Sequence, residues 1–280
     1  MAFISNMNKE KKKMKSHILT SEELFSRLPL SENKIITIVG AGGKTTLLYA
    51  LAKKLAANSQ KVLATTTTHI MRPTYSPKIP SGFILEQENV SELHHAFSTS
   101  NLVYLGIPMT LANSCINQKE GYQTKWQSPS LDFLEKIRSV PDYILCEGDG
   151  SRRLPVKIPR KKEPVLYPGT EMVIGIIGLY CLGQPVKNNL FGWKENPSFF
   201  QTLLSSTEGT EHRITTDTLF QIALSPEGLQ KSTENRVFHV VLNQADTLSY
   251  NRMTDIELLS QKIRDNGIPC HIVSLKNQNR

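Results

Sequence analysis

The chain has 280 residues, of which 39% are hydrophobic and 21% charged, and its formal net charge is +8. This balance excludes a mainly disordered protein and allows one large α/β domain with a full hydrophobic core. The longest apolar run, residues 172–183, has 12 residues including three glycines, whereas a membrane-spanning helix needs about 20 apolar residues, so we expect a buried strand there and no membrane partner.

Apolar strands alternate with helical segments along the chain. Apolar and β-branched runs predict strands at residues 34–39, 61–67, 82–85, 102–105, 143–146, 173–177, 236–242 and 270–274. Apolar residues spaced for one helical face predict helices at residues 44–57, 91–96, 131–138 and 253–265. This alternation predicts an α/β fold with a mostly parallel sheet and helices on both faces.

We expect the chain to have two parts. Residues 1–33 are predicted to be a basic N-terminal tail with a short helix, and residues 34–280 a single domain. Weak periodicity and several turn-forming residues at 187–211 predict an insert or a long surface loop within it. The four cysteines lack C-x-x-C spacing, and the N-terminus lacks the apolar stretch of a secretory signal. A cytoplasmic protein with reduced cysteines is therefore expected.

The strongest motif lies between the first predicted strand and the first predicted helix. Glycines let a backbone curl around a phosphate, and the next helix offers free N–H groups and the positive end of its dipole. Lys44 is expected to reach phosphate oxygens and act in catalysis, and Thr45 to bind Mg²⁺. The residues assigned to nucleotide binding are Gly40, Ala41, Gly42, Gly43, Lys44, Thr45 and Thr46.

This motif predicts a nucleotide-binding domain like that of the P-loop NTPases. Its spacing, G-x-x-G-K-T, is shorter than the usual G-x-x-x-x-G-K-[ST]. A glycine turn that only joins a strand to a helix is the structural alternative.

Polar residues also follow two other predicted strands. Ligands bind at the carboxyl ends of strands in open α/β sheets, so Thr67 and Thr68 are further candidates for Mg²⁺, although successive threonines also suit an ordinary strand. Residues 147–150 read Glu-Gly-Asp-Gly. We expect Glu147 to bind Mg²⁺ or its water, and both Glu147 and Asp149 to act in catalysis.

The positive charge is concentrated in two segments. Residues 9–15 carry a net charge of +4 and residues 151–162 a net charge of +6, which leaves −2 for the rest. Nucleic-acid binding is therefore unlikely, since it would need basic residues across a whole face, and aromatic residues are absent from both segments. Arg152 is predicted to stabilise charge at a terminal phosphate as a catalytic residue. The alternative is a solvated basic loop or a site for an anionic partner.

Residues 243–246 read Asn-Gln-Ala-Asp after another buried strand. Guanine-nucleotide proteins carry Asn-Lys-x-Asp at this place, where the aspartate accepts guanine protons, and Gln244 replaces that lysine here. We expect Asn243 and Asp246 to recognise the base, with the choice between ATP and GTP left open. An ordinary Asn/Asp turn is the alternative.

Taken together, these motifs resemble the YqeC-type family, the accessory proteins of selenium-dependent molybdenum hydroxylases. The resemblance rests on residues 40–46, 65–69, 147–151, 163–164 and 243–246. Gly148 stands where the family commonly has alanine. The resemblance implies a cytoplasmic role in maturing such a hydroxylase or its selenium-containing molybdenum cofactor, with the hydroxylase or a cofactor intermediate as partner.

Three functions remain open at this point. The first is Mg²⁺-dependent hydrolysis of ATP or GTP in support of that maturation. The second is an ATP-dependent ligase or kinase, because the short loop also resembles that of the cell-wall amino-acid ligases. The third is a non-catalytic chaperone that nucleotide binding gates.

Overall fold

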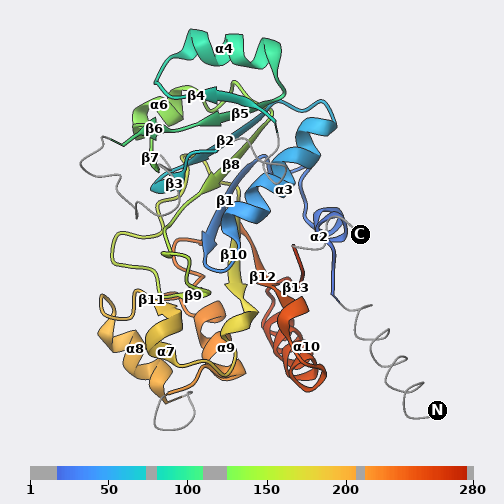
Figure 1. The fold of residues 1–280 in the computed structure, drawn as a ribbon, viewed down its shortest axis with the longest axis vertical. Coiled ribbons are helices and arrows are strands. Elements are labelled where there is room, and N and C mark those ends of the chain that lie inside the picture. Colours follow the sequence, from blue (N-terminus) through green and yellow to red (C-terminus); the bar gives the residue numbers. More distant parts are fainter. Residues whose placement is uncertain (1–17, 74–80, 110–124, 206–211, 276–280) are drawn as a thin grey trace, which may run out of the picture.

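The computed structural model describes residues 18–73, 81–109, 125–205 and 212–275. Its main sheet has eight strands in the order β13-β12-β10-β1-β8-β2-β5-β4, and every neighbouring pair is parallel (Figure 1). The strands are β1 (Ile35–Gly40), β2 (Val62–Thr66), β4 (Phe83–Leu85), β5 (Leu102–Leu105), β8 (Tyr143–Glu147), β10 (Met172–Gly178), β12 (Val237–Asn243) and β13 (Cys270–Ile272). The predicted α/β fold, like that of the P-loop NTPases, is confirmed.

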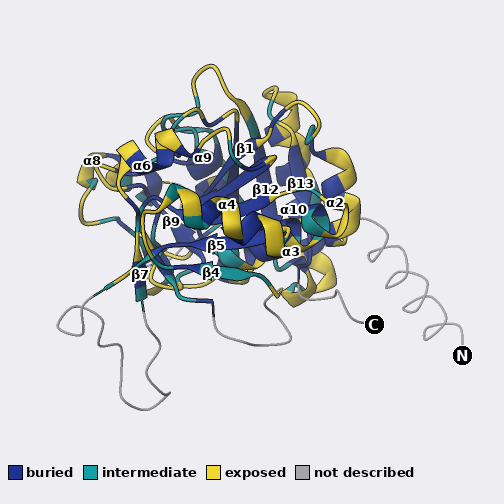
Figure 2. Ribbon diagram, turned by 90° about the horizontal axis from the view of Figure 1, so that it is seen from above, coloured by how far each residue is buried: buried dark blue, intermediate teal, exposed yellow. Residues whose placement is uncertain are grey.

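Helices cover both faces of this sheet. They are α2 (Ser21–Arg27), α3 (Lys44–Ala57), α4 (Val90–Thr99), α6 (Leu131–Lys136), α9 (Thr216–Leu224) and α10 (Tyr250–Asp265). Successive strand residues point to opposite faces: Ile36 belongs to the buried cluster of α2 and α3, and its neighbour Ile35 to the cluster of α4 and α6. Helices α9 and α10 cover the β12 end of this second face. Figure 2 shows the buried sheet between helices whose outer sides are exposed.

Two small sheets flank the main one and were not predicted. Strands β3 (His69–Met71), β7 (Lys125–Gln127) and β6 (Ile107–Pro108) form an antiparallel sheet. Strands β9 (Val156–Lys157) and β11 (Leu190–Phe191) pair in parallel. Runs this short have no clear period in the sequence, because tertiary contacts decide their conformation.

Residues 187–205 are not a bare surface loop. They include most of α7 (Val186–Asn189), all of β11 and α8 (Pro197–Leu204), and a turn at residues 192–195. Phe199 and Leu203 of α8 are buried in the same cluster as α9 and α10. Residues 206–211 lie outside the described residues, so the boundaries of an insert stay a prediction.

Most predicted elements are present with shifted ends. Helix α3 has the predicted bounds, whereas α4 and α10 begin one and three residues earlier than predicted. Helices α8 and α9 and the short 3₁₀ turns η1 (Leu179–Cys181) and η2 (Ala245–Thr247) were not predicted. The free cysteines Cys146, Cys181 and Cys270 are buried as expected. Cys115 and residues 1–17 of the predicted tail lie outside the described residues.

In the described part of the chain, no helix is both long and apolar enough to cross a membrane.

Candidate functional site

The glycine motif forms the turn between β1 and α3, at the carboxyl edge of the sheet (Figure 1). Gly40, Gly42 and Gly43 have φ angles of 91°, 88° and 132°, which side chains rarely tolerate. A Cβ atom at Gly40 would collide with the carbonyl oxygen of Ile176 on β10. Strand β1 also lies where the chain changes direction across the sheet, the usual place for a ligand crevice.

The N-terminus of α3 carries no side-chain cap. Side chains of Thr20, Asn89, Ser130, Asn196 and Thr215 accept a backbone N–H at the start of α2, α4, α6, α8 and α9. In α3 the capping position is Gly43, and the first turn has no acidic residue. Its first N–H groups therefore remain available to an anion.

Lys44 points back into the loop beside the predicted carboxylates. Its Nζ donates to the Gly40 carbonyl at 2.6 Å and lies 3.2 Å from Asp149 Oδ1 and 3.8 Å from Glu147 Oε1. The side chain is 3% exposed. Burial alone would lower the pKa of Lys44, but the charges of Asp149 and Glu147 raise it above its ordinary value. Lys44 is therefore a cation in this site.

Glu147 and Thr45 place a carboxylate and a hydroxyl group next to each other at the start of α3. Thr45 Oγ1 donates to Glu147 Oε2 at 2.7 Å. Burial raises the pKa of Glu147, against the opposing effects of Lys44 and this hydrogen bond. No cluster of three or more His, Cys, Asp or Glu residues able to bind a metal occurs among the described residues. A hydroxyl and one carboxylate suit Mg²⁺ that arrives with nucleotide phosphates, since Mg²⁺ commonly takes few protein ligands there.

Asp149 connects the loop to a second buried lysine that the sequence interpretation missed. Its Oδ2 accepts the Gly40 N–H at 3.0 Å and lies 3.1 Å from Lys157 Nζ. Lys157 also donates to Glu163 and to the Gly150 carbonyl, each at 2.7 Å. Within the basic segment Lys157 had been indistinguishable from solvated lysines. Its apolar neighbours Val156 and Ile158 were the available sign of a buried strand.

The other predicted residues near the loop lie in varied surroundings. Thr67 donates its hydroxyl to the Val165 carbonyl, whereas the Thr68 hydroxyl is buried with no hydrogen-bond partner among the described residues. Thr46 is exposed in the first turn of α3. Arg152 is exposed, with its guanidinium carbon 5.8 Å from the centre of the Phe191 ring.

The predicted base-recognition residues lie at the ends of β12 and β13. Asn243 Nδ2 donates to the Gly42 carbonyl at 2.8 Å, and its Oδ1 accepts the Leu275 N–H at 3.3 Å. Both amide atoms thus connect the glycine loop to the end of β13. Asp246 is exposed and accepts a hydrogen bond from Ser274 Oγ at 2.7 Å. The serine after the last strand therefore orients this carboxylate, and base recognition by Asn243 and Asp246 stays a prediction.

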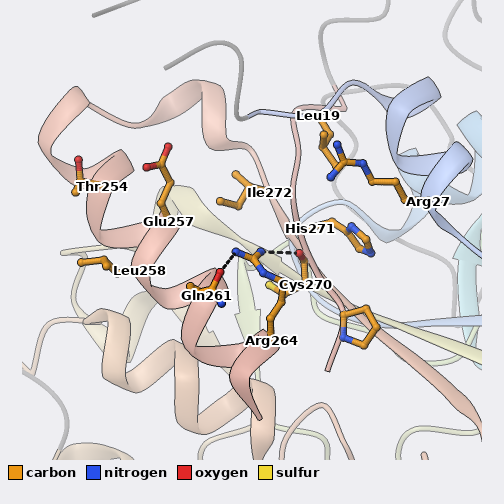
Figure 3. Close-up of a pocket in the computed structure, with 11 residues that line it drawn as sticks. Leu19, Arg27, Thr254, Glu257, Leu258, Gln261, Arg264, Cys270, His271 and Ile272 are labelled. Atoms are coloured by element: carbon orange, nitrogen blue, oxygen red, sulfur yellow. Dashed lines mark hydrogen bonds between the residues drawn. The ribbon is translucent and has the colours of Figure 1, made fainter. Parts of the chain in front are cut away.

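A pocket lies elsewhere, on the outer side of β13. It has a volume of about 570 Å³ and lies between α2 and α10, with Arg27, Gln261 and His271 among its lining residues (Figure 3). None of the residues predicted from the motifs lines it. The glycine loop remains the better candidate for the functional site. Its residues have a specific chemistry, whereas the residues that line this pocket do not.

Comparisons with known proteins agree with the motif pattern. The model of the YqeC protein family matches residues 36–194, more than half of the chain. An Escherichia coli K12 protein named "Uncharacterized protein YqeC" is 34% identical over 164 residues. This chain spans 58% of the length of that relative, and the match covers 58% of this chain. No solved structure matches. The family match contains the glycine loop, Glu147, Asp149 and Lys157 and ends before Asn243, and on this match the chain belongs to the YqeC family.

Proposed function

We propose that this protein binds a Mg²⁺-nucleotide, ATP or GTP, with its phosphates in the glycine loop. The observation that carries the proposal is the 2.7 Å hydrogen bond between Thr45 Oγ1 and Glu147 Oε2 at the mouth of an uncapped helix. It joins the hydroxyl of the Gly-Lys-Thr motif to the carboxylate that ends β8. An ordinary strand-to-helix turn would need neither group.

Each residue has a distinct part in this proposal. The N–H groups of residues 42–45 and the Lys44 ammonium bind phosphate oxygens. Thr45 and Glu147 hold Mg²⁺, which would neutralise phosphate charge. Asp149 positions the loop through the Gly40 N–H and Lys44. Asp246 recognises the base.

The wider role that we propose is hydrolysis of that nucleotide in the cytoplasm during maturation of a selenium-dependent molybdenum hydroxylase or its cofactor. Support for it comes from family membership together with a site suited to phosphoryl chemistry. The partner would be the hydroxylase or a molybdenum- or selenium-containing cofactor intermediate.

Calorimetric titration with MgATP and MgGTP tests the proposal. The Lys44→Ala variant should lose at least about 100-fold in affinity, because a buried cation that contacts phosphate is worth about 3 kcal/mol. Lys54→Ala is the matched control: Lys54 lies on the same helix, is 40% exposed and pairs only with exposed Glu22. Absence of nucleotide binding by the wild type, or equal affinity in both variants, would refute the proposal.

Product analysis then separates three modes of action. Release of inorganic phosphate indicates hydrolysis, and phosphate transfer to a second substrate indicates a kinase or ligase. Tight binding without turnover, even with a candidate hydroxylase present, indicates a nucleotide-gated chaperone.

A further inference from the structure

A strained turn follows the catalytic carboxylates. The Leu154 N–H donates to the Ser151 carbonyl at 2.9 Å, which closes a four-residue turn. Its two central residues, Arg152 and Arg153, have φ angles of 49° and 63°. Glycine and asparagine usually occupy such positions, and other residues are strained there. Strain of this kind often accompanies a functional role for the side chains.

Of the two arginines, Arg152 lies over an aromatic ring. The Arg152 guanidinium carbon lies 5.8 Å from the centre of the Phe191 ring on β11. Lys157 Nζ and the Arg160 guanidinium carbon lie 5.3 Å and 5.5 Å from the same centre. Three cations therefore surround one half-buried aromatic ring. Arg153 has no such contact with any ring of the described residues.

Not every cation around Phe191 has an ion-pair partner within the described residues. Lys44, Lys157 and Arg160 are matched by the three carboxylates of Glu147, Asp149 and Glu163 through ion pairs. Arg152 makes no ion pair with any described residue, and it is the surplus cation of the group. Glu163 already joins Lys157 and Arg160, so Arg152 is the one cation at the ring that has no carboxylate partner among the described residues.

This surplus charge lies beside the glycine loop. Arg152 follows Asp149, whose Oδ2 bonds the Gly40 N–H, by three residues. After the turn, the Pro155 carbonyl accepts the Gly178 N–H at 2.8 Å, and a Cβ atom added to Gly42 would lie 2.9 Å from that carbonyl. An anion on Arg152 would therefore lie next to nucleotide phosphates in the loop, in a separate position.

We infer that Arg152 and Arg160, supported on the Phe191 ring, form a second anion subsite. It binds the phosphate or carboxylate group of a second substrate beside the nucleotide. Both groups match the planar donors of arginine, and packing of the guanidinium groups on an aromatic ring restricts their orientation. The role of this subsite, binding a second substrate beside a nucleotide, rests on the proposed function. The existence of the subsite does not, since the arginines and Phe191 are arranged independently of any nucleotide.

The test compares Arg152→Gly with Arg153→Gly. Each variant removes one charge from the same turn and relieves the same backbone strain, so both should fold. Orthophosphate and, separately, acetate are titrated calorimetrically into protein without nucleotide and into protein saturated with Mg²⁺ and a non-hydrolysable ATP or GTP analogue. We expect one of the two anions to bind nucleotide-saturated wild type, with at least about 10-fold weaker binding in Arg152→Gly and less than about 3-fold weakening in Arg153→Gly.

Three results would overturn the inference: no binding of either anion, equal losses in the two variants, or loss of nucleotide affinity in Arg152→Gly without loss of anion affinity. The last result would assign Arg152 to the nucleotide itself. If the wild type binds no nucleotide, the proposed function fails, but the two variants still test the subsite in nucleotide-free protein.

Discussion

The middle of the sheet's carboxyl edge and its β12–β13 end hold polar residues in different ways. Around β1 and β8, three cations and three carboxylates form a connected ion-pair network, in which every residue except Arg160 is buried. Around β12 and β13, Asn243 uses its amide to bond two backbone groups, and Asp246 is exposed and oriented by Ser274. Hydrogen bonds, not ion pairs, fix the geometry of this second region.

In the first region charged groups pair with one another, whereas in the second region hydrogen bonds hold the backbone in place. Burying five ionised groups costs more free energy than their mutual attraction reliably returns, so stability alone does not explain such a network. A network of this kind is better explained by binding of a charged ligand. Asn243 instead stabilises the loop conformation that would receive the ligand. The following predictions test this contrast, beginning with the largest expected effect.

Asp149→Asn should cause the largest loss of stability. Asp149 is fully buried between Lys44 and Lys157, and removal of its charge leaves both lysines partly uncompensated, at a cost of about 3–5 kcal/mol. Urea unfolding would measure this loss of stability. Glu22→Gln removes the exposed pair with Lys54 and should cost less than about 1 kcal/mol. Similar losses of stability in both variants would mean that the buried ion pairs contribute no more to stability than an exposed ion pair.

Acid should destabilise the two regions in different pH ranges. His271 on β13 lies with its Nε2 3.0 Å from His239 Nδ1. Burial, then His239, Arg27 and Arg264, lower its pKa from 6.5 to about 4. As the pH falls, the unfolded chain binds a proton at this histidine before the folded chain does. The stability that neutral His271 contributes is therefore complete above pH 6.5 and is lost as the pH falls toward 4, up to about 3 kcal/mol.

Glu163 should act at lower pH. Burial opposes ionisation, but Arg160 and Lys157 lower its pKa from 4.5 to about 2. The stability that ionised Glu163 contributes is present above pH 4.5 and is lost as the pH falls toward 2. Unfolding midpoints measured from pH 7 to 3 should therefore show the histidine phase first. His271→Asn should remove that phase and Glu163→Gln should leave it; an unchanged phase in His271→Asn would contradict the assignment.

Asn243→Ala should have an intermediate effect. The buried Leu275 N–H loses its acceptor and the Gly42 carbonyl loses its donor, at a cost of about 1–3 kcal/mol. A looser loop should weaken ATP and GTP binding alike, which calorimetry would detect. Asn266→Ala is the control, because the Asn266 amide only bonds the Lys262 carbonyl on the exposed end of α10. Selective loss of one nucleotide would instead support direct base contact by Asn243.

The sequence predicts the loop better than its surroundings, for a physical reason. Glycine, lysine and threonine act within a few neighbouring residues, so the turn and the start of α3 follow from local chemistry. Glu147 and Asp149 follow from one further rule, that parallel strands end at the same edge. Lys157 was missed because its burial depends on Asp149 and Glu163, and prolines around it favour a loop. Asn243 was recognised, but its bonds to Gly42 and Leu275 depend on the packing of three strands.

Asp246→Asn should have the smallest effect on stability and the most specific effect on binding. The residue is exposed, and asparagine can still accept the hydrogen bond from Ser274, so we expect a change below about 0.5 kcal/mol in unfolding free energy. A carboxylate that accepts two guanine protons loses one of these bonds on conversion to an amide, so GTP affinity should fall about 10-fold while ATP affinity is unchanged. Asp255→Asn, an exposed position on α10, should change neither affinity. Equal affinities of wild type and Asp246→Asn for both nucleotides would leave Ser274 and Asp246 as an ordinary strand-end turn.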